Sequence, residues 1–226
     1  FNIINYSPSL GYDAEAHFAY VNHVARYLPD SFELPSSSET REFFSPPLGY
    51  IVPAVGQVIC RNFIESADYL KDCQPFFGKF TQIFQSILYL LTLLINLFTI
   101  KLITNNKSFL NTGYILLLSL LAVNYKTISM IRGELYILFF MSLLLYIIFK
   151  VEKNQFESSI KTIVFAGIVI AGIALSRQWG FLLFPPLILL LFMNRKLPKK
   201  NYFKFWLYSS ALGASLSSWF YFGLYR

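Results

Sequence analysis

From residue 80 onward, long apolar runs alternate with short basic clusters, and this alternation indicates a polytopic membrane protein. Across the chain 55% of the residues are hydrophobic and 14% are charged, whereas a soluble domain of this size needs a far more polar surface. A helix needs about 20 mostly apolar residues to cross the hydrocarbon core. The sequence therefore predicts an all-α fold with six spanning helices, at Phe80–Ile103, Thr112–Met130, Leu135–Phe149, Ile160–Ser176, Trp179–Asn194 and Phe205–Tyr225.

The positions of the basic residues predict the orientation of these helices. Ten of the 19 Lys and Arg residues lie in the loops after the first, third and fifth runs. They are Lys101, Lys107, Lys150, Lys153, Lys161, Arg195, Lys196, Lys199, Lys200 and Lys204. Short basic loops stay in the cytoplasm, so we expect residues 1–79 and the hairpins 126–134 and 176–180 to face outward. The basic clusters form no groove with interleaved aromatic residues, so we expect no nucleic-acid partner.

Two of the predicted spans are short. Leu135–Phe149 has 15 residues and Trp179–Asn194 has 16, so their outer ends should lie at or below the outer interface. Ionisable groups at that depth usually face a wet cavity or a partner. The alternative is that the long arginine side chains reach the headgroups, but Glu134 is too short to do so. We therefore favour a functional cavity for Arg132 and Glu134.

The first 79 residues hold nine of the twelve carboxylates and are predicted to form an extracytoplasmic segment, while residues 80–226 form the membrane bundle. A helix is expected over Tyr12–Leu28, ended by Pro29. It places Asp13 and His17 on one face at i,i+4 spacing. Asp13 also suits a helix cap, and His17 also suits a packed or solvated position. One Asp–His pair falls short of a catalytic zinc site, which needs three protein ligands.

A second apolar segment, Leu48–Ile59, follows the pair Pro46-Pro47. Pro47 suits the first turn of a helix. The segment is too short to span the membrane and contains Pro53, so we expect it to lie in the interface. Cys60 and Cys73 fall in the same outward part, where an oxidising compartment permits a bridge, but their spacing does not require one.

Motifs for nucleotide chemistry are absent from the sequence. It contains no glycine-rich phosphate loop and no dinucleotide-binding fingerprint, and it has no Gly-x-Ser-x-Gly elbow. A cytosolic enzyme that uses nucleotide donors is therefore not supported.

Four segments, in this order, resemble the membrane glycosyltransferases of the GT-C superfamily, in particular the dolichyl-phosphate-mannose protein mannosyltransferase and aminoarabinose-transferase type. They are Gly11-Tyr12-Asp13-Ala14-Glu15-Ala16-His17, Glu42-Phe43-Phe44-Ser45-Pro46-Pro47-Leu48-Gly49-Tyr50, Ile131-Arg132-Gly133-Glu134 and Leu175-Ser176-Arg177-Gln178-Trp179-Gly180. The resemblance covers nearly all of the chain. Members of the family commonly have eleven or more spans, so we expect this chain, which begins at Phe1, to be about half of one.

The resemblance implies an inverting transfer of a sugar from a polyprenyl-phosphate donor to an acceptor hydroxyl on the outer face. It assigns Asp13 as the base or acceptor-orienting carboxylate and Glu134 as a second acidic residue. Glu42 matches the acid before the proline pair, although relatives place that acid directly before Pro-Pro, where this chain has Phe-Phe-Ser. Relatives also often carry an acidic pair where Ala14 here separates Asp13 from Glu15. Some relatives hold a divalent metal near the positions of Asp13 or Glu42.

The residues themselves fit this chemistry. A departing phosphate needs cations, and guanidinium groups bind phosphate bidentately. Arg132 and Arg177 are therefore the predicted phosphate ligands, with Lys126 adding charge. Tyr12, Tyr20 and Trp179 are candidates for stacking on sugar or prenyl groups, although aromatic residues at an interface commonly form a belt.

Other functions keep the same fold. The chain can be read as an enzyme of envelope-glycan polymerisation or ligation. It can also be read as a transporter with Arg132 and Glu134 as a relay, or as a non-catalytic subunit of envelope-glycan assembly. The middle parts of the predicted spans contain almost no ionisable residues, which argues against transport.

We expect an integral, multi-pass protein, in a bacterial plasma membrane rather than in the endoplasmic reticulum.

Overall fold

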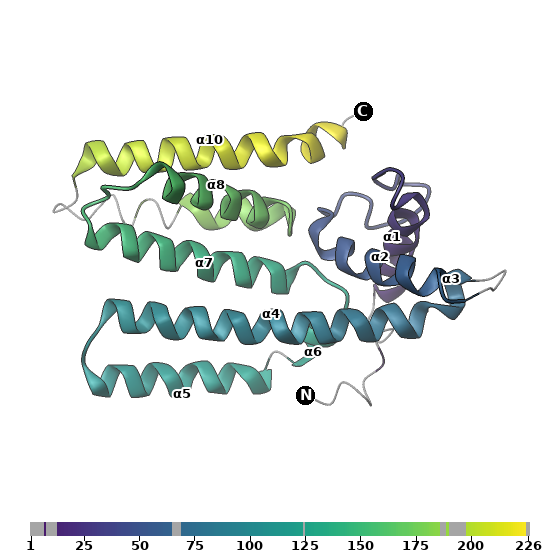
Figure 1. The fold of residues 1–226 in the computed structure, drawn as a ribbon, viewed down its shortest axis with the longest axis horizontal. Coiled ribbons are helices and arrows are strands. Elements are labelled where there is room, and N and C mark those ends of the chain that lie inside the picture. Colours follow the sequence, from purple (N-terminus) through teal and green to yellow (C-terminus); the bar gives the residue numbers. More distant parts are fainter. Residues whose placement is uncertain are drawn as a thin grey trace. The chain divides into compact units, whose positions relative to one another are not determined.

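In the computed structural model, residue 7 and residues 13–64, 69–123, 125–185, 189 and 198–224 are described. All regular structure in these ranges is helical, as predicted (Figure 1). The chain folds into two compact units. Unit 1 contains residues 1–90 and 121–135, and unit 2 contains residues 91–120 and 136–226. The predicted division at residue 79 concerns the boundary between water and lipid, and it stays a prediction.

Unit 1 is built from short helices and the first part of a long one (Figure 1). Its helices are α1 (Ala14–Tyr27), α2 (Leu48–Arg61), α3 (Tyr69–Asp72), the start of α4 (Gln74–Ile103) and α6 (Tyr125–Ser129). Helix α1 fulfils the prediction for Tyr12–Leu28 within two residues, and it ends just before Pro29 as expected. Helix α2 continues through Pro53 to Arg61, because a proline in the second turn removes only one backbone hydrogen bond.

Helices α1 and α2 pack side by side (Figure 1) and bury the core of unit 1. The core joins one face of α1 to α2, to the start of α4 and to Ile131. The C-terminal end of α1 is closed by Arg61 of α2, whose guanidinium donates to the carbonyls of Ala25 (3.2 Å) and Leu28 (2.9 Å). Carbonyls at a helix end have no partner within the helix, so Arg61 fixes the angle at which α2 meets α1.

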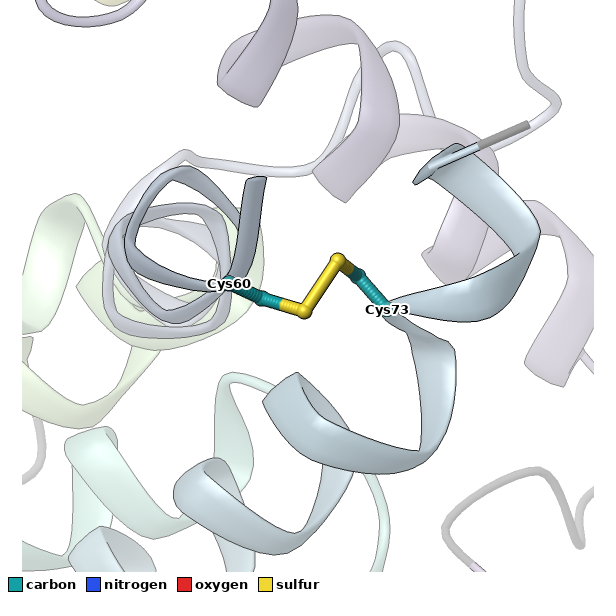
Figure 2. Close-up of a disulfide and its surroundings, with 2 residues drawn as sticks. All are labelled: Cys60 and Cys73. Carbon is teal, nitrogen blue, oxygen red and sulfur yellow. A yellow bond between two sulfur atoms is a disulfide. The ribbon is translucent and has the colours of Figure 1, made fainter. Parts of the chain in front are cut away.

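A disulfide joins Cys60 in the last turn of α2 to Cys73 just before α4 (Figure 2). Both half-cystines are buried in the core of unit 1. The bridge that the sequence permitted is therefore present. It closes a loop that contains α3 and ties α2 to the beginning of the long helix.

Unit 2 is an assembly of longer helices. It contains the second part of α4, most of α5 (Lys107–Val123), most of α7 (Glu134–Lys153), α8 (Ile160–Ala174), the 3-10 helix η1 (Gln178–Leu183) and α10 (Lys199–Gly223). Helices α8 and α10 lie side by side (Figure 1). They approach closely because glycines face the contact: a Cβ on Gly167 would meet Leu212, and one on Gly213 would meet Ile170. Small residues allow this approach between apolar helices.

Polar side chains inside the apolar helices find partners across the helix contacts. Asn96 of α4 donates through Nδ2 to the hydroxyl of Ser142 on α7 at 3.0 Å. In unit 1, Gln82 donates through Nε2 to the carbonyl of Ser129 at 2.9 Å. Each of these hydrogen bonds joins two segments that are far apart in the sequence.

Two helices, α4 and α7, are long and apolar enough to cross a membrane by length and composition. Helices α2 and α8 are apolar but shorter. The described helices thus support two spans rather than the six predicted. Part of the reason is that residues 186–188 and 190–194 of the fifth predicted span lie outside the described ranges. The described beginning of that span is the 3-10 helix η1.

The predicted shortness of the third span is wrong. Helix α7 has 20 residues, Glu134–Lys153, instead of 15. Lys150 and Lys153 lie in the last turn of this helix, where their positive charges interact favourably with the negative end of the helix dipole. The prediction had ended the span before these two lysines. The prediction that Arg132 and Glu134 lie at or below the outer membrane interface therefore no longer follows from the length of this helix.

The bridge between Cys60 and Cys73 leads to a first prediction. Replacing both residues by alanine should lower the free energy of unfolding by about 2–3 kcal/mol, because the bridge restricts a loop of 13 residues in the unfolded chain. Thermal unfolding of the purified protein in detergent measures the effect, and reduced wild type should match the variant. Quantitative alkylation of both cysteines in unreduced, unfolded protein would contradict the bridge.

Candidate functional site

Asp13 lies at the N-terminal end of α1. It occupies the N-cap position but makes no side-chain capping hydrogen bond. Its side chain therefore does not cap the helix, a role that the sequence had left open. The carboxylate remains 42% exposed, so it is accessible to a ligand.

Arg132 is the nearest cation to this carboxylate among the described ion pairs. Its Nη2 lies 3.9 Å from Oδ2 of Asp13, and its side chain is 29% exposed. The pair joins residues that are 119 positions apart in the sequence. An exposed pair at this distance contributes little to stability, but it places a carboxylate and a guanidinium at one accessible point of unit 1.

Two glycines hold the segment that carries Arg132 against α2. A Cβ on Gly49 would lie 3.1 Å from both Cα and N of Gly133 and 3.2 Å from the carbonyl carbon of Arg132. Both glycines are buried. The first turn of α2 thus contacts the backbone of residues 132–133 directly, and this contact fixes the position from which the Arg132 side chain extends toward Asp13.

His17 lies one turn after Asp13 on α1 and is 4% exposed. Its Nδ1 forms a hydrogen bond of 2.8 Å with the hydroxyl of Tyr50 on α2. The ring of Tyr50 stacks on that of Tyr20, with 3.9 Å between centroids and 13° between planes. The imidazole is therefore held in one orientation by a buried partner, in place of the solvated position that the sequence also allowed.

Glu42 reaches the same region from the loop between α1 and α2. Thr40 pins this loop to α1 by donating its hydroxyl to the carbonyl of Ala16 at 2.7 Å. Its Oγ1 also accepts the amide of Glu42 at 3.2 Å. The hydroxyl of Ser45 donates to Oε2 of Glu42, and Tyr20 donates to the carbonyl of Ser45 at 3.0 Å. Glu42 is thus positioned by a chain of hydrogen bonds that leads back to α1.

Tyr20 itself is fully buried. Burial raises the pKa of the Tyr20 phenol well above its usual range, with smaller contributions from Tyr50 and from the charge of Glu42. Tyr20 therefore stays neutral at physiological pH and remains a hydrogen-bond donor to Ser45.

Asp13, His17 and Glu42 converge. Each offers one ligating atom, and these atoms all lie within 4.8 Å of one another. Two of the three residues come from α1 and the third from the loop before α2. The sequence predicted the shared face of Asp13 and His17, while the meeting with Glu42 required the folded loop. Carboxylate oxygen and imidazole nitrogen are ligands of divalent transition metals.

The other predicted site residues are distributed more widely. Glu134 opens α7 and is half-buried, where a carboxylate complements the positive end of the helix dipole. Lys126 belongs to α6, but its side chain lies outside the described part of the chain, as does Tyr12. Arg177 and Trp179 belong to unit 2. Trp179 is 47% exposed on η1, and Gly180 closes the turn by donating its amide to the carbonyl of Arg177 at 3.0 Å.

Sequence reasoning missed the residues that position the site. Tyr50, Ser45 and Thr40 act through contacts with residues 24 to 33 positions away. Gly49 and Gly133 were part of the motifs quoted above, and glycine beside a candidate site residue is a signal of close backbone approach. No comparable signal in the sequence singles out Tyr50.

Comparisons of the chain with protein-family models, with curated protein sequences and with solved structures give no match.

The contact of Gly49 with Gly133 leads to a second prediction. Gly49→Ala should lower the free energy of unfolding by about 1–3 kcal/mol, because the added methyl group meets backbone atoms that must move. Gly113→Ala on α5 is the matched control, since its Cβ meets only the flexible side chain of Ile100 while alanine gains the same helix propensity. Thermal unfolding compares the two. An equal or higher stability of Gly49→Ala would contradict the packing.

Proposed function

We propose that this protein is a membrane glycosyltransferase that transfers a sugar, with inversion, from a polyprenyl-phosphate donor to an acceptor hydroxyl on the extracytoplasmic face. The observation that carries the proposal is the placement of Asp13. Its carboxylate makes no capping hydrogen bond and lies 3.9 Å from Arg132. A general base and a phosphate-binding guanidinium at one accessible point are the two groups that this reaction requires.

The proposed reaction assigns each group a role. The acceptor oxygen forms a bond to the anomeric carbon while the bond from that carbon to the phosphate oxygen breaks, and the phosphate leaves with the electron pair. The acceptor proton passes to the carboxylate of Asp13. Arg132 stabilises the negative charge that develops on the leaving phosphate. Further charge from Glu134 and Lys126 belongs to the same proposal, whereas the roles of Arg177 and Trp179 stay predictions from the sequence.

The location on the outer face has two supports. A disulfide between Cys60 and Cys73 is stable in an oxidising compartment and rare in the cytosol. The second support is in unit 2, where the loop after α7 contacts the beginning of α10 through Asn201 and the carbonyl of Gln155 (3.4 Å). Five lysines that are near these two residues in the sequence are exposed, namely Lys150, Lys153, Lys161, Lys199 and Lys200. Basic residues close to the ends of membrane-spanning helices favour the cytoplasmic side.

We propose further that six spans carry the site, with residues 1–79 outside the cell. Helices α4 and α7 are two of these spans by length and composition. The remaining four rest on the sequence pattern. A transporter or a non-catalytic subunit of envelope-glycan assembly uses the same arrangement, and the transfer assay below separates these functions.

The proposal predicts loss of transfer when Asp13 changes. In membranes that contain the full-length protein, transfer of radiolabelled sugar from polyprenyl-phosphate donors should fall about 10²–10⁴-fold in Asp13→Asn, the usual contribution of a general base. Transfer by Arg132→Ala should fall by about 10²-fold or more. Transfer should recover in part in Arg132→Lys, which restores the charge without the bidentate geometry.

The controls are an acid and a base elsewhere in unit 1. Asp30→Asn and Arg41→Ala change exposed side chains of the same segment and should retain full transfer at equal expression. Equal transfer by wild type and Asp13→Asn would remove Asp13 as the base. Absence of transfer with every polyprenyl-phosphate donor would favour the transporter or the assembly subunit.

A further inference from the structure

We propose that a groove in unit 2 binds one anionic phospholipid, with the lipid phosphate at the loop between α7 and α8. The groove has a volume of about 540 Å³, which is in the usual range of ligand pockets. It is lined by α7 between residues 143 and 151, by the loop that follows α7, and by the first turns of α8 up to residue 165. The site goes beyond the proposed function and takes from it only the membrane orientation, which puts this loop on the cytoplasmic side.

The groove is apolar at one end and charged at the other. Its apolar end is lined by Leu143 and Ile147 of α7 and by Phe165 of α8. Lys150 and Lys161 line the end at the loop. Leu143 lies about 10 Å from Lys150 along the axis of α7. When α7 spans the membrane, which its length and composition allow, the apolar end points into the bilayer and the lysines lie at its surface. A ligand with a charged head and a hydrocarbon tail matches this arrangement.

The two lysines have no carboxylate partner in the described part of the chain. Neither Lys150 nor Lys161 belongs to a described ion pair, and both side chains are exposed. The ammonium of Lys150 lies 5.9 Å from the centroid of the Tyr146 ring, which also lines the groove. Glu157 lines the groove as well, so two lysines and one carboxylate leave one net positive charge. This charge favours an anion, and lysine is a common ligand of phosphate groups.

The start of α8 adds hydrogen-bond donors at the same end of the groove. Ser159 caps this helix, since its Oγ accepts the amide of Thr162 at 3.3 Å. The first amides of the helix have no partner within it, and the positive end of the helix dipole favours phosphate. The loop before the helix is anchored by Phe156, which is buried and whose ring contacts Tyr202 and Phe205 of α10. The donors therefore occupy fixed positions beside the lysines.

Lysines near helix ends can also act through membrane orientation alone. That role depends on charge near the membrane and needs no groove. Lys101 and Lys153 satisfy it equally, because both are exposed in unit 2, but neither lines the groove. Basic pockets between membrane helices on the cytoplasmic side bind anionic lipid head groups. The groove therefore distinguishes Lys150 and Lys161 from a matched pair that carries the same charge.

Native mass spectrometry of the purified protein, freed of lipid in detergent, tests the charged end. Phosphatidylglycerol is the anionic probe, and phosphatidylcholine is the zwitterionic one. We expect wild type to bind one phosphatidylglycerol at least about tenfold more tightly than phosphatidylcholine. Lys150→Gln with Lys161→Gln should weaken the binding of phosphatidylglycerol about twentyfold, at about fivefold for each lysine. Lys101→Gln with Lys153→Gln removes the same charge and should retain the affinity of wild type.

The apolar end is tested by a second pair of variants. Phe165→Ala should weaken the binding of phosphatidylglycerol several-fold, because it removes apolar surface that the hydrocarbon tail contacts. Phe165 is 48% exposed, so this change leaves the core intact. Ile168→Ala is the control, since Ile168 is 49% exposed on the same helix but does not line the groove. Inorganic phosphate in millimolar excess should not displace the lipid, because it lacks the tail.

The outcomes that overturn the site are equally specific. Equal affinity of wild type for the two lipids would remove it, and this comparison needs no variant. Equal losses in the two lysine pairs would reduce the lysines to general charge. Displacement of the lipid by inorganic phosphate would assign the groove to free anions instead. Melting temperatures of the lipid-free variants are compared first, so that a misfolded variant is recognised. Because no sugar donor is present, failure here leaves the transfer assay unaffected, and the reverse also holds.

Discussion

The close contact of Gly49 with the backbone of residues 132–133 determines where the Arg132 side chain begins. It brings a segment from the middle of the chain against the first turn of α2, so closely that a Cβ at position 49 would lie 3.1 Å from the backbone of Gly133. Arg132 leaves this segment and reaches Asp13 at the end of α1. The contact thus helps to hold the guanidinium near the carboxylate, although the two residues are 119 positions apart in the sequence.

The polar groups around this point form a connected set. Tyr50 links α2 to His17, and Tyr20 links α1 to the loop through Ser45, whose hydroxyl contacts Glu42. Buried polar groups are costly unless they are hydrogen-bonded, so each link restricts the next. The result is a carboxylate–imidazole–carboxylate group in which His17 and Glu42 are both linked to the same aromatic pair, Tyr20 and Tyr50. This preorganisation is what a catalytic or metal-binding site requires of its supporting residues.

The sequence predicted the local features well. The face shared by Asp13 and His17 follows from the helical repeat, and the end of α1 follows from Pro29. The meeting of Glu42 with that face was not predictable, because it depends on the hydrogen bond from Thr40 to the carbonyl of Ala16 across a loop. The length of α7 was underestimated for a different reason. Composition marks where a run stops being apolar, whereas backbone hydrogen bonds decide where a helix ends, and Lys150 and Lys153 lie within it.

The proximity of Asp13 and Arg132 is the central claim, and cross-linking tests it most directly. Asp13→Cys with Arg132→Cys, treated in membranes with a bifunctional thiol reagent whose spacer matches the two removed side chains, should give a cross-linked peptide pair detectable by mass spectrometry. Cys60 and Cys73 do not react because they are bridged. In the control, Asp30→Cys with Arg132→Cys, the first cysteine lies beyond the other end of α1, about 21 Å along the helix axis, and no cross-link is expected. Cross-linking of the control pair but not of the pair at 13 and 132 would contradict the account.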